Sequence, residues 1–138
     1  MSGVKVSSVE VSGEAQHVKG YHRLEVWHKA HLFALKVYQV TANFPEHEKF
    51  GLTSQLRRAA LSVPVNIVEG QASASKKEFL NFLNIANRSL VEAEYLLEVA
   101  RALGYLSGQV YKEVELLRQS VGNLLTGLMR SLRARLRA

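Results

Sequence analysis

Glu25, His28 and His31 are the first residues whose types and spacing could support chemistry. Glu-x-x-His on a helix is the motif that holds the metal in di-iron helical bundles. Such a site also needs a second Glu-x-x-His helix and further inward-facing glutamates, and Glu94 and Glu98 have no histidine three residues on. The sequence contains no cysteine, which excludes thiolate metal ligands and disulfides. We therefore predict no metal, no cofactor and no catalytic residue.

Arginine is the second residue type with chemical potential, because each guanidinium can donate hydrogen bonds to phosphate oxygens. The segment 116–138 carries arginine repeatedly and contains no acid. At about 100° per residue, Arg130, Arg133 and Arg137 fall within an arc of roughly 60° on a helix. This arc predicts a phosphate-binding face. The alternative is a solubilising end, because cations near a helix C-terminus also favour the helix dipole.

Arg57 and Arg58 form a second candidate for phosphate binding, since both fall outside the expected core stripe of their helix. For at least one of them, a salt bridge to a glutamate of another subunit is the alternative. The chain has 18 Lys and Arg against 12 acids, a net charge of +6, which predicts attraction to polyanions. No zinc finger, ribonucleoprotein motif or basic zipper is present. We therefore expect phosphate-dominated, salt-sensitive and weakly sequence-selective binding.

The elements that must position these residues are helices, because apolar residues recur at helical spacing beyond residue 20. Phe44-Pro45 ends the first helix, since a residue before proline leaves the helical region. Ser75 and Glu78 form a capping box, and Gly104 suits the C′ position of a helix. The predicted fold is an all-α, antiparallel, up-down-up-down four-helix bundle after a flexible leader at residues 1–20. The helices are expected at about 21–43, 52–70, 76–103 and 108–135.

Each helix carries one apolar stripe that we assign to the core of the bundle. The most regular stripe, in the third helix, consists of Phe79, Leu83, Ala86, Leu90, Ala93, Leu97 and Ala100. The stripe predicted for the fourth helix consists of Val110, Val114, Leu117, Val121, Leu124 and Leu128.

Three helices carry further apolar residues away from these stripes, among them Leu32 and Phe33 in the first helix. Scattered apolar residues are normal on protein surfaces, which is the alternative interpretation. A second apolar patch on three helices favours contacts between subunits, so we predict a homo-oligomer. The residues predicted for its interface are Leu61, Val65, Val68, Val91, Tyr95 and Val99.

The sequence gives no sign of membrane insertion or secretion. No segment approaches the roughly 18 apolar residues that a membrane span needs. The first twenty residues lack the apolar stretch of a secretory signal. We therefore expect a cytoplasmic protein without a membrane partner.

Several motifs between residues 21 and 106 resemble one bacterial family. They are Leu24-x-Val26-Trp27-x-x-Ala30, Phe44-Pro45, Phe50-Gly-Leu-Thr-Ser-Gln-Leu-Arg-Arg-Ala-Ala60, Ser62-Val-Pro-Val-Asn-Ile-Val-Glu-Gly70, Glu78-Phe79-x-x-Phe82-Leu83-x-Ile85-Ala86 and Leu103-Gly104-Tyr105-Leu106. They make the chain similar to the four-helix-bundle proteins named after the 23S ribosomal RNA intervening sequence. That family is similar in fold to the accessory variability protein of diversity-generating retroelements, a barrel-shaped pentamer that binds nucleic acid and a reverse transcriptase.

The resemblance implies a ring-like homopentamer in which Arg57 and Arg58 match the family's paired arginines. The chain departs from the family at residues 71–75, where an arginine is common, and at Arg88, where glycine is common. Part of the basic surface is then expected at Arg88 and at the C-terminal arginines.

The sequence therefore predicts a non-catalytic accessory protein that binds RNA or DNA and recruits or supports a reverse transcriptase. The alternative is a protein-interaction scaffold, or a partner of the ribosomal RNA intervening sequence. The residues predicted to bind nucleic acid are Arg57, Arg58, Arg88, Arg130, Arg133 and Arg137.

Overall fold

The computed structural model describes residues 20–138, which form helices and no strand. The leader predicted at residues 1–20 lies outside the described residues except for Gly20. The elements are η2 (Gly20–Arg23), α2 (Glu25–Thr41), η3 (Glu46–Glu48), α3 (Leu52–Gln71), α4 (Lys76–Ala102) and α5 (Gly108–Arg137). The predicted all-α fold with four α-helices is therefore confirmed for this part of the chain.

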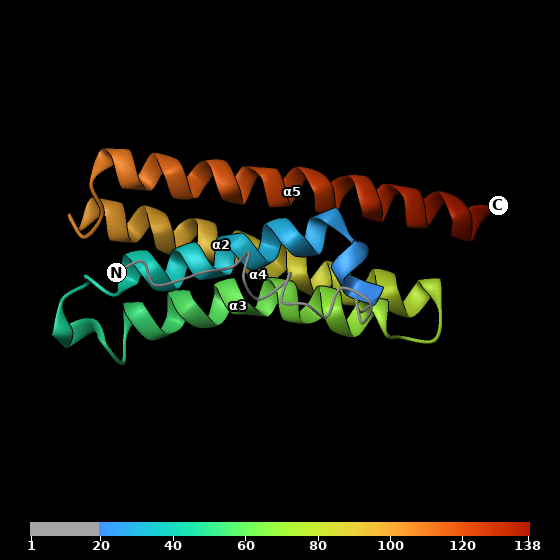
Figure 1. Cartoon of the computed structure of the whole chain (residues 1–138), viewed down its shortest axis with the longest axis horizontal. Coiled ribbons are helices and arrows are strands. Elements are labelled where there is room, and N and C mark those ends of the chain that lie inside the picture. Colours follow the sequence, from blue (N-terminus) through green and yellow to red (C-terminus); the bar gives the residue numbers. More distant parts are fainter. Residues whose placement is uncertain (1–19) are drawn as a thin grey trace, which may run out of the picture.

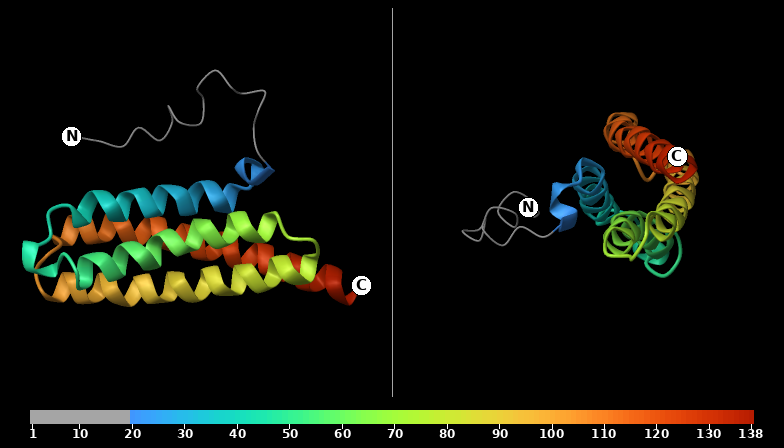
Figure 2. Two further views of the ribbon diagram at one scale, coloured as in Figure 1. Left: turned by 90° about the horizontal axis from the view of Figure 1, so that it is seen from below. Right: turned by 90° about the vertical axis from the view of Figure 1, so that its right-hand side faces the viewer.

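The four helices lie side by side, and the chain reverses direction from each helix to the next (Figure 1). Seen along the helices, α2, α3, α4 and α5 follow one another around the bundle (Figure 2). Each helix contacts its neighbour in sequence, and α2 also contacts α5. Every helix therefore has two neighbours, which widens the arc of side chains that it buries.

The first helix is shorter than predicted at both ends. Gly20–Arg23 forms a 3-10 turn, and the extended backbone of Leu24 (ψ 119°) separates this turn from α2. At the other end the helix gives way to turns in which the Phe44 N–H donates to the carbonyl of Thr41 at 3.0 Å. Pro45 follows directly and disfavours a helical conformation of Phe44.

The ends of α4 follow the local sequence. Ser75 Oγ accepts the N–H of Glu78 at 3.1 Å, and Glu78 Oε1 accepts the N–H of Ala74 at 3.0 Å, one residue before the N-cap. At the C-terminal end, Gly104 has a φ of +83°, in the left-handed region that favours glycine. The Tyr105 N–H then reaches back to the carbonyl of Ala100 at 2.9 Å. This is the Schellman motif, which satisfies carbonyls that the helix leaves open.

The core runs the length of the bundle. The predicted α4 stripe from Leu83 to Ala100 is buried at every position, and Phe79 packs partly buried against the core. At one end, a Cβ on Gly70 would lie 2.8 Å from both Phe79 Cδ1 and Phe82 Cβ. Glycine at this position therefore lets the last turn of α3 pack directly on the first turns of α4.

Two core predictions are wrong. Phe33, which was placed outside the α2 stripe, is fully buried. It is buried because α2 packs between α3 and α5, so its buried arc is wider than one stripe. In the second half of α5, Leu124 and Leu128 are only partly buried. The buried positions of α5 are Val114, Val121, Leu125, Met129 and Leu132.

The reason for the α5 difference is the period of a straight helix. Val114 and Leu132 lie about five turns apart at 3.6 residues per turn, so they share one face. The predicted stripe from Val114 to Leu128 followed a seven-residue repeat, which drifts by about 20° per heptad on a straight helix.

Candidate functional site

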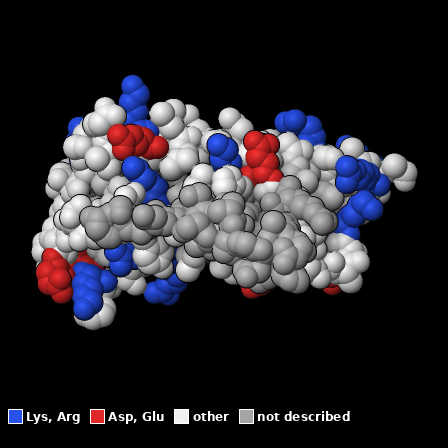
Figure 3. Space-filling model, viewed as in Figure 1, with Lys and Arg blue, Asp and Glu red and all other residues white. Residues whose placement is uncertain are grey.

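The C-terminal turns of α5 present arginines to solvent. Arg130, Arg133 and Arg137 are exposed, and none of them forms an ion pair with another residue in the described range. The same turns bury Met129 and Leu132, which places the three arginines on the side of α5 away from the core. Lys and Arg side chains gather at this end of the molecule (Figure 3).

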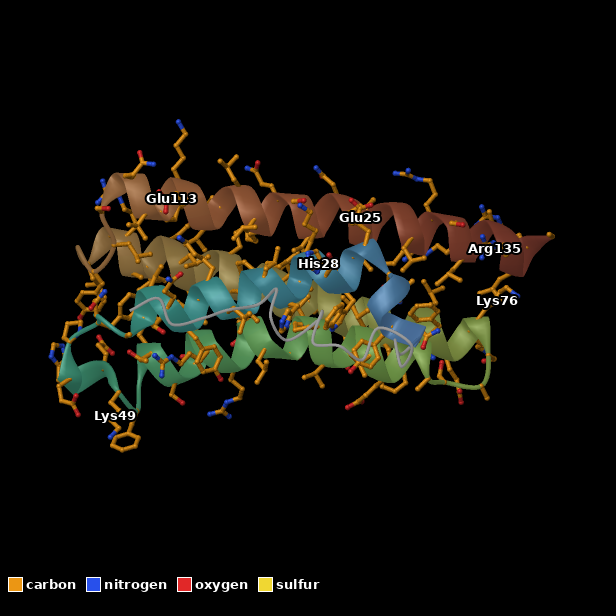
Figure 4. The ribbon with its side chains drawn as sticks, viewed as in Figure 1. Glu25, His28, Lys49, Lys76, Glu113 and Arg135 are labelled. Carbon is orange, nitrogen blue, oxygen red and sulfur yellow. The ribbon has the colours of Figure 1, made fainter. Side chains whose placement is uncertain are left out.

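A groove of about 640 Å³ opens at the same end, between the α3–α4 connector and the last turns of α5. Its cations are Lys76 and Lys77 at the start of α4 and Arg135 of α5. Figure 4 shows Lys76 and Arg135 close to each other at this end of the bundle. Phe79 and Leu136 add apolar surface, and the described lining contains no carboxylate. We call this site the basic groove.

Sequence reasoning missed the basic groove. Arg135 lies roughly 160° around the helix from Arg137, so a helical wheel removes it from the predicted arginine face. Lys76 and Lys77 are not among the residues predicted to bind nucleic acid. A clue in the sequence was the pair of lysines directly after the N-cap Ser75, but its meeting with Arg135 depends on how α5 packs.

The paired arginines of α3 have different environments. Arg57 Nε donates to Thr41 Oγ1 at 2.7 Å, and its Nη2 donates to the carbonyl of Tyr38 at 3.2 Å. Its guanidinium also lies 4.8 Å from the centre of the Tyr38 ring, a cation–π contact. Arg57 therefore ties α3 to the end of α2 within one subunit, so neither predicted role describes its contacts here.

Arg58 is exposed and lines a second groove, of about 530 Å³, between α3 and α4. Glu92 lines the same groove, but no ion pair joins the two side chains. Below them, Ser62 Oγ and Ser89 Oγ are 2.8 Å apart and join the two helices. Arg88 is exposed on α4 and does not line this groove.

In one subunit the six predicted arginines do not form one surface. Arg57 and Arg58 lie near the beginning of α3, whereas the α5 arginines lie at the opposite end of the bundle (Figure 1).

Arg118 is part of the structure of the bundle. Its side chain is 13% exposed and lies within hydrogen-bond distance of Glu115 on the same helix, at 2.7 Å. It also lies 3.4 Å from Glu94 on α4. The Glu115 hydrogen bond raises the pKa of Arg118. Nearby, burial and then the charges of Glu115 and Glu98 raise the pKa of Tyr111.

The predicted oligomer interface is partly exposed and partly used by the bundle itself. Leu61, Val65, Val91 and Tyr95 are exposed, and Tyr95 is 64% exposed. The remaining two, Val68 and Val99, pack against the core of their own subunit. The exposed apolar residues that sequence reasoning did not assign to this interface include Ile85, Leu116 and Phe50.

The motif of Glu25, His28 and His31 lies beside the ring of Trp27. The rings of Trp27 and His31 stack with their centres 5.0 Å apart, and Glu25 is exposed. Within residues 20–138, no group of three or more His, Asp or Glu could hold a metal ion. None of the helices in the described range has the length and apolar character needed to cross a lipid bilayer.

Comparison with known proteins identifies the family of this chain. The sequence pattern described as 23S rRNA-intervening sequence protein matches residues 22–127. The chain belongs to this family. The matched region runs from the end of η2 into the second half of α5. The last arginines of α5 lie beyond it, namely Arg130, Arg133, Arg135 and Arg137.

A solved structure supports the same family fold. A protein of unknown function from the S23 ribosomal protein family of Bacteroides thetaiotaomicron is 26% identical, with a TM-score of 0.71. The match covers 76% of this chain and 95% of that chain. No curated protein matches the sequence.

Proposed function

We propose that this member of the 23S rRNA-intervening sequence family is a non-catalytic accessory protein that binds RNA or DNA. The observation that carries the proposal is the concentration of cations at one end of the bundle. Arg130, Arg133 and Arg137 are exposed without an ion pair among the described residues, and the basic groove lies beside them. Such cations attract phosphates and release the counterions of a nucleic acid.

The proposal includes a homo-oligomer, in its finer form a ring-like homopentamer in the cytoplasm. Its support is the exposed apolar surface of Leu61, Val65, Val91 and Tyr95 on the outer sides of α3 and α4. Burying these side chains between copies removes apolar surface from water. Repeating the basic end around a ring also raises avidity, because several weak phosphate contacts then act on one nucleic acid.

The proposed protein partner is a reverse transcriptase. Its support is the resemblance to the accessory protein of diversity-generating retroelements described above. Copurification of a reverse transcriptase with the full chain, and its loss from an oligomer-deficient variant, is the result expected. A chain that retains no polymerase from cells that contain one contradicts this part of the proposal.

Nucleic-acid binding is tested by fluorescence anisotropy across a salt series. The double variant Arg130→Gln/Arg133→Gln loses two cations at the basic end, and Lys49→Gln/Lys112→Gln loses two exposed cations elsewhere. We expect the first variant to weaken binding by about tenfold. The slope of log K against log salt concentration should also become less steep by up to about two, because two phosphate contacts are lost. The second variant should have a smaller effect on both. Equal losses of affinity in both variants would mean that binding depends on total charge and not on the basic end. An absence of binding at low salt refutes the proposal.

Oligomerisation is tested separately by light scattering. Tyr95→Glu places a charge on the predicted interface, and Leu116→Glu places one on a similarly exposed residue of α5. We expect the wild type and the Leu116 variant to have the same mass, several times that of one chain, and the Tyr95 variant to have a smaller mass. A wild-type mass equal to one chain contradicts the oligomer.

The second candidate function is a protein-interaction scaffold. The observation that favours it is the same exposed apolar surface, which a different protein could cover instead of a second copy. Replacing Arg130, Arg133 and Arg137 by glutamate separates the two functions. Partner binding that survives this reversal of charge favours the scaffold, and its loss favours the nucleic-acid-binding protein.

A further inference from the structure

We infer that the basic groove holds one unpaired nucleotide, so that the protein prefers single-stranded or frayed nucleic acid to a continuous duplex. The inference rests on the proposed function and assigns a role to Lys76, Lys77, Phe79 and Arg135. It differs from that function because the exposed arginines on the outer face of α5 can contact the phosphates of either form.

The first argument is the shape of the site. The groove is open to solvent, and its volume of about 640 Å³ is sufficient for one nucleotide. A duplex presents its phosphates on a convex surface and keeps its bases stacked inside. It can lie across the outer arginines of α5, but it cannot place a base in the groove without opening.

The second argument is the pairing of charge with apolar surface. The groove is lined by cations from two helices, namely Lys76 and Lys77 of α4 and Arg135 of α5. Phe79 and Leu136 line the same groove. Cations beside an aromatic ring suit a nucleotide, because the phosphate meets the cations while the base packs on the ring. A site for phosphate alone has no use for the apolar part of the lining.

The third argument is that the aromatic side of the groove is fixed. Gly70 also lines the groove, and its missing Cβ leaves the space that the Phe79 ring occupies against the end of α3. Phe79 is partly buried and packs against the core. Its ring is therefore held in place before a ligand arrives, which reduces the entropy lost on binding.

The test compares a labelled oligothymidylate with a blunt duplex of the same length at one salt concentration. The probing variant is Arg135→Gln, and the matched control is Arg133→Gln, because both residues are exposed, lie in the last turns of α5 and carry the same charge. We expect the wild type to bind the single strand more tightly than the duplex. Arg135→Gln is expected to weaken single-strand binding about tenfold with little effect on the duplex, whereas Arg133→Gln weakens both forms alike.

Three results overturn the inference, and they separate it from the proposed function. If both forms bind and Arg135→Gln changes them equally, the groove has no preference for an unpaired nucleotide and only this inference fails. If polyglutamate of equal charge displaces the oligothymidylate as well as unlabelled oligothymidylate does, the groove binds any polyanion. If neither nucleic acid binds, the proposed function fails with it.

Discussion

The hydroxyl group of Tyr105 donates a 2.9 Å hydrogen bond to Oε2 of Glu48. The other carboxylate oxygen of Glu48 accepts the backbone N–H of Leu52 at 3.1 Å, at the start of α3. One carboxylate thus joins the η3 turn, the first turn of α3 and the α4–α5 connector. These hydrogen bonds, the backbone one foremost, hold the pKa of Glu48 below its usual value of 4.5. The same carboxylate raises the pKa of Tyr105.

Glu48→Gln is expected to destabilise the protein at neutral pH, because the amide has one oxygen in place of the two that accept these hydrogen bonds, and that neutral oxygen accepts more weakly than a carboxylate. The folded-state pKa of Glu48 lies below the unfolded one, so its contribution is present above about pH 4.5 and is lost as the pH falls through the folded-state pKa. Urea unfolding of both proteins at neutral and acidic pH measures the difference. The difference in unfolding free energy between the two proteins should become smaller at acidic pH. The control Glu46→Gln, at an exposed neighbouring residue, should change stability little at either pH. A difference that stays constant with pH contradicts the role of the Glu48 charge.

Arg118→Met is expected to destabilise the bundle by about 2 kcal/mol, because it leaves Glu94 and Glu115 without their common cation at the α4–α5 contact. The loss is moderated because the Glu94 side chain is 39% exposed and water can solvate it. Arg133→Met is the control, since Arg133 is exposed and should change the unfolding free energy by less than about 0.5 kcal/mol. Equal effects of the two substitutions argue against the ion network as a source of stability.

Two glycines should respond to alanine with opposite signs. Gly104→Ala is expected to cost about 1 kcal/mol, because its φ of +83° strains an L-residue although nothing lies within 4 Å of the added Cβ. Gly127→Ala, with nothing within 4 Å inside α5, is expected to stabilise the protein by up to about 1 kcal/mol. Thermal unfolding of both variants at one protein concentration measures the signs. Stabilisation by Gly104→Ala contradicts the left-handed backbone conformation of Gly104 after the end of α4.

Phe33→Ala is expected to cost about 3–5 kcal/mol, because the ring is fully buried and its removal leaves a cavity. Phe50→Ala, at a ring that is 89% exposed, should change stability by less than about 0.5 kcal/mol. Chemical denaturation of both variants provides the measurement. A small loss of stability for Phe33→Ala contradicts the burial of Phe33 and favours the surface position that the helical wheel predicts.

Local signals in the sequence were sufficient for the number of helices and for several of their ends. Ser75 with Glu78, and Gly104 before Tyr105, are recognisable because the partners in each cap lie within a few residues. Periodicity predicted the α4 stripe because that helix keeps its core residues on one side. Phe33 shows the limit of this reasoning, because a stripe gives the centre of a buried arc and only the neighbouring helices determine its width.

The candidate site was less predictable for the same reason. Arg57 and Arg58 are adjacent in sequence and equivalent as charges, but only Arg57 meets Thr41 and Tyr38 of α2. Arg135 was left out of the predicted site because its position on α5 was judged by that helix alone. Its relation to Lys77 depends on how α5 lies against the α3–α4 connector, which no local pattern encodes.

The basic groove brings Lys77 together with Arg135, a residue of the last turn of α5. Helix ends open more readily than helix centres. A ligand in the groove can therefore select molecules whose final turn is wound, and it shifts the balance between wound and frayed ends by mass action. Warming should then weaken ligand binding below the unfolding temperature of the bundle, because Arg135 lies in the last turn of α5.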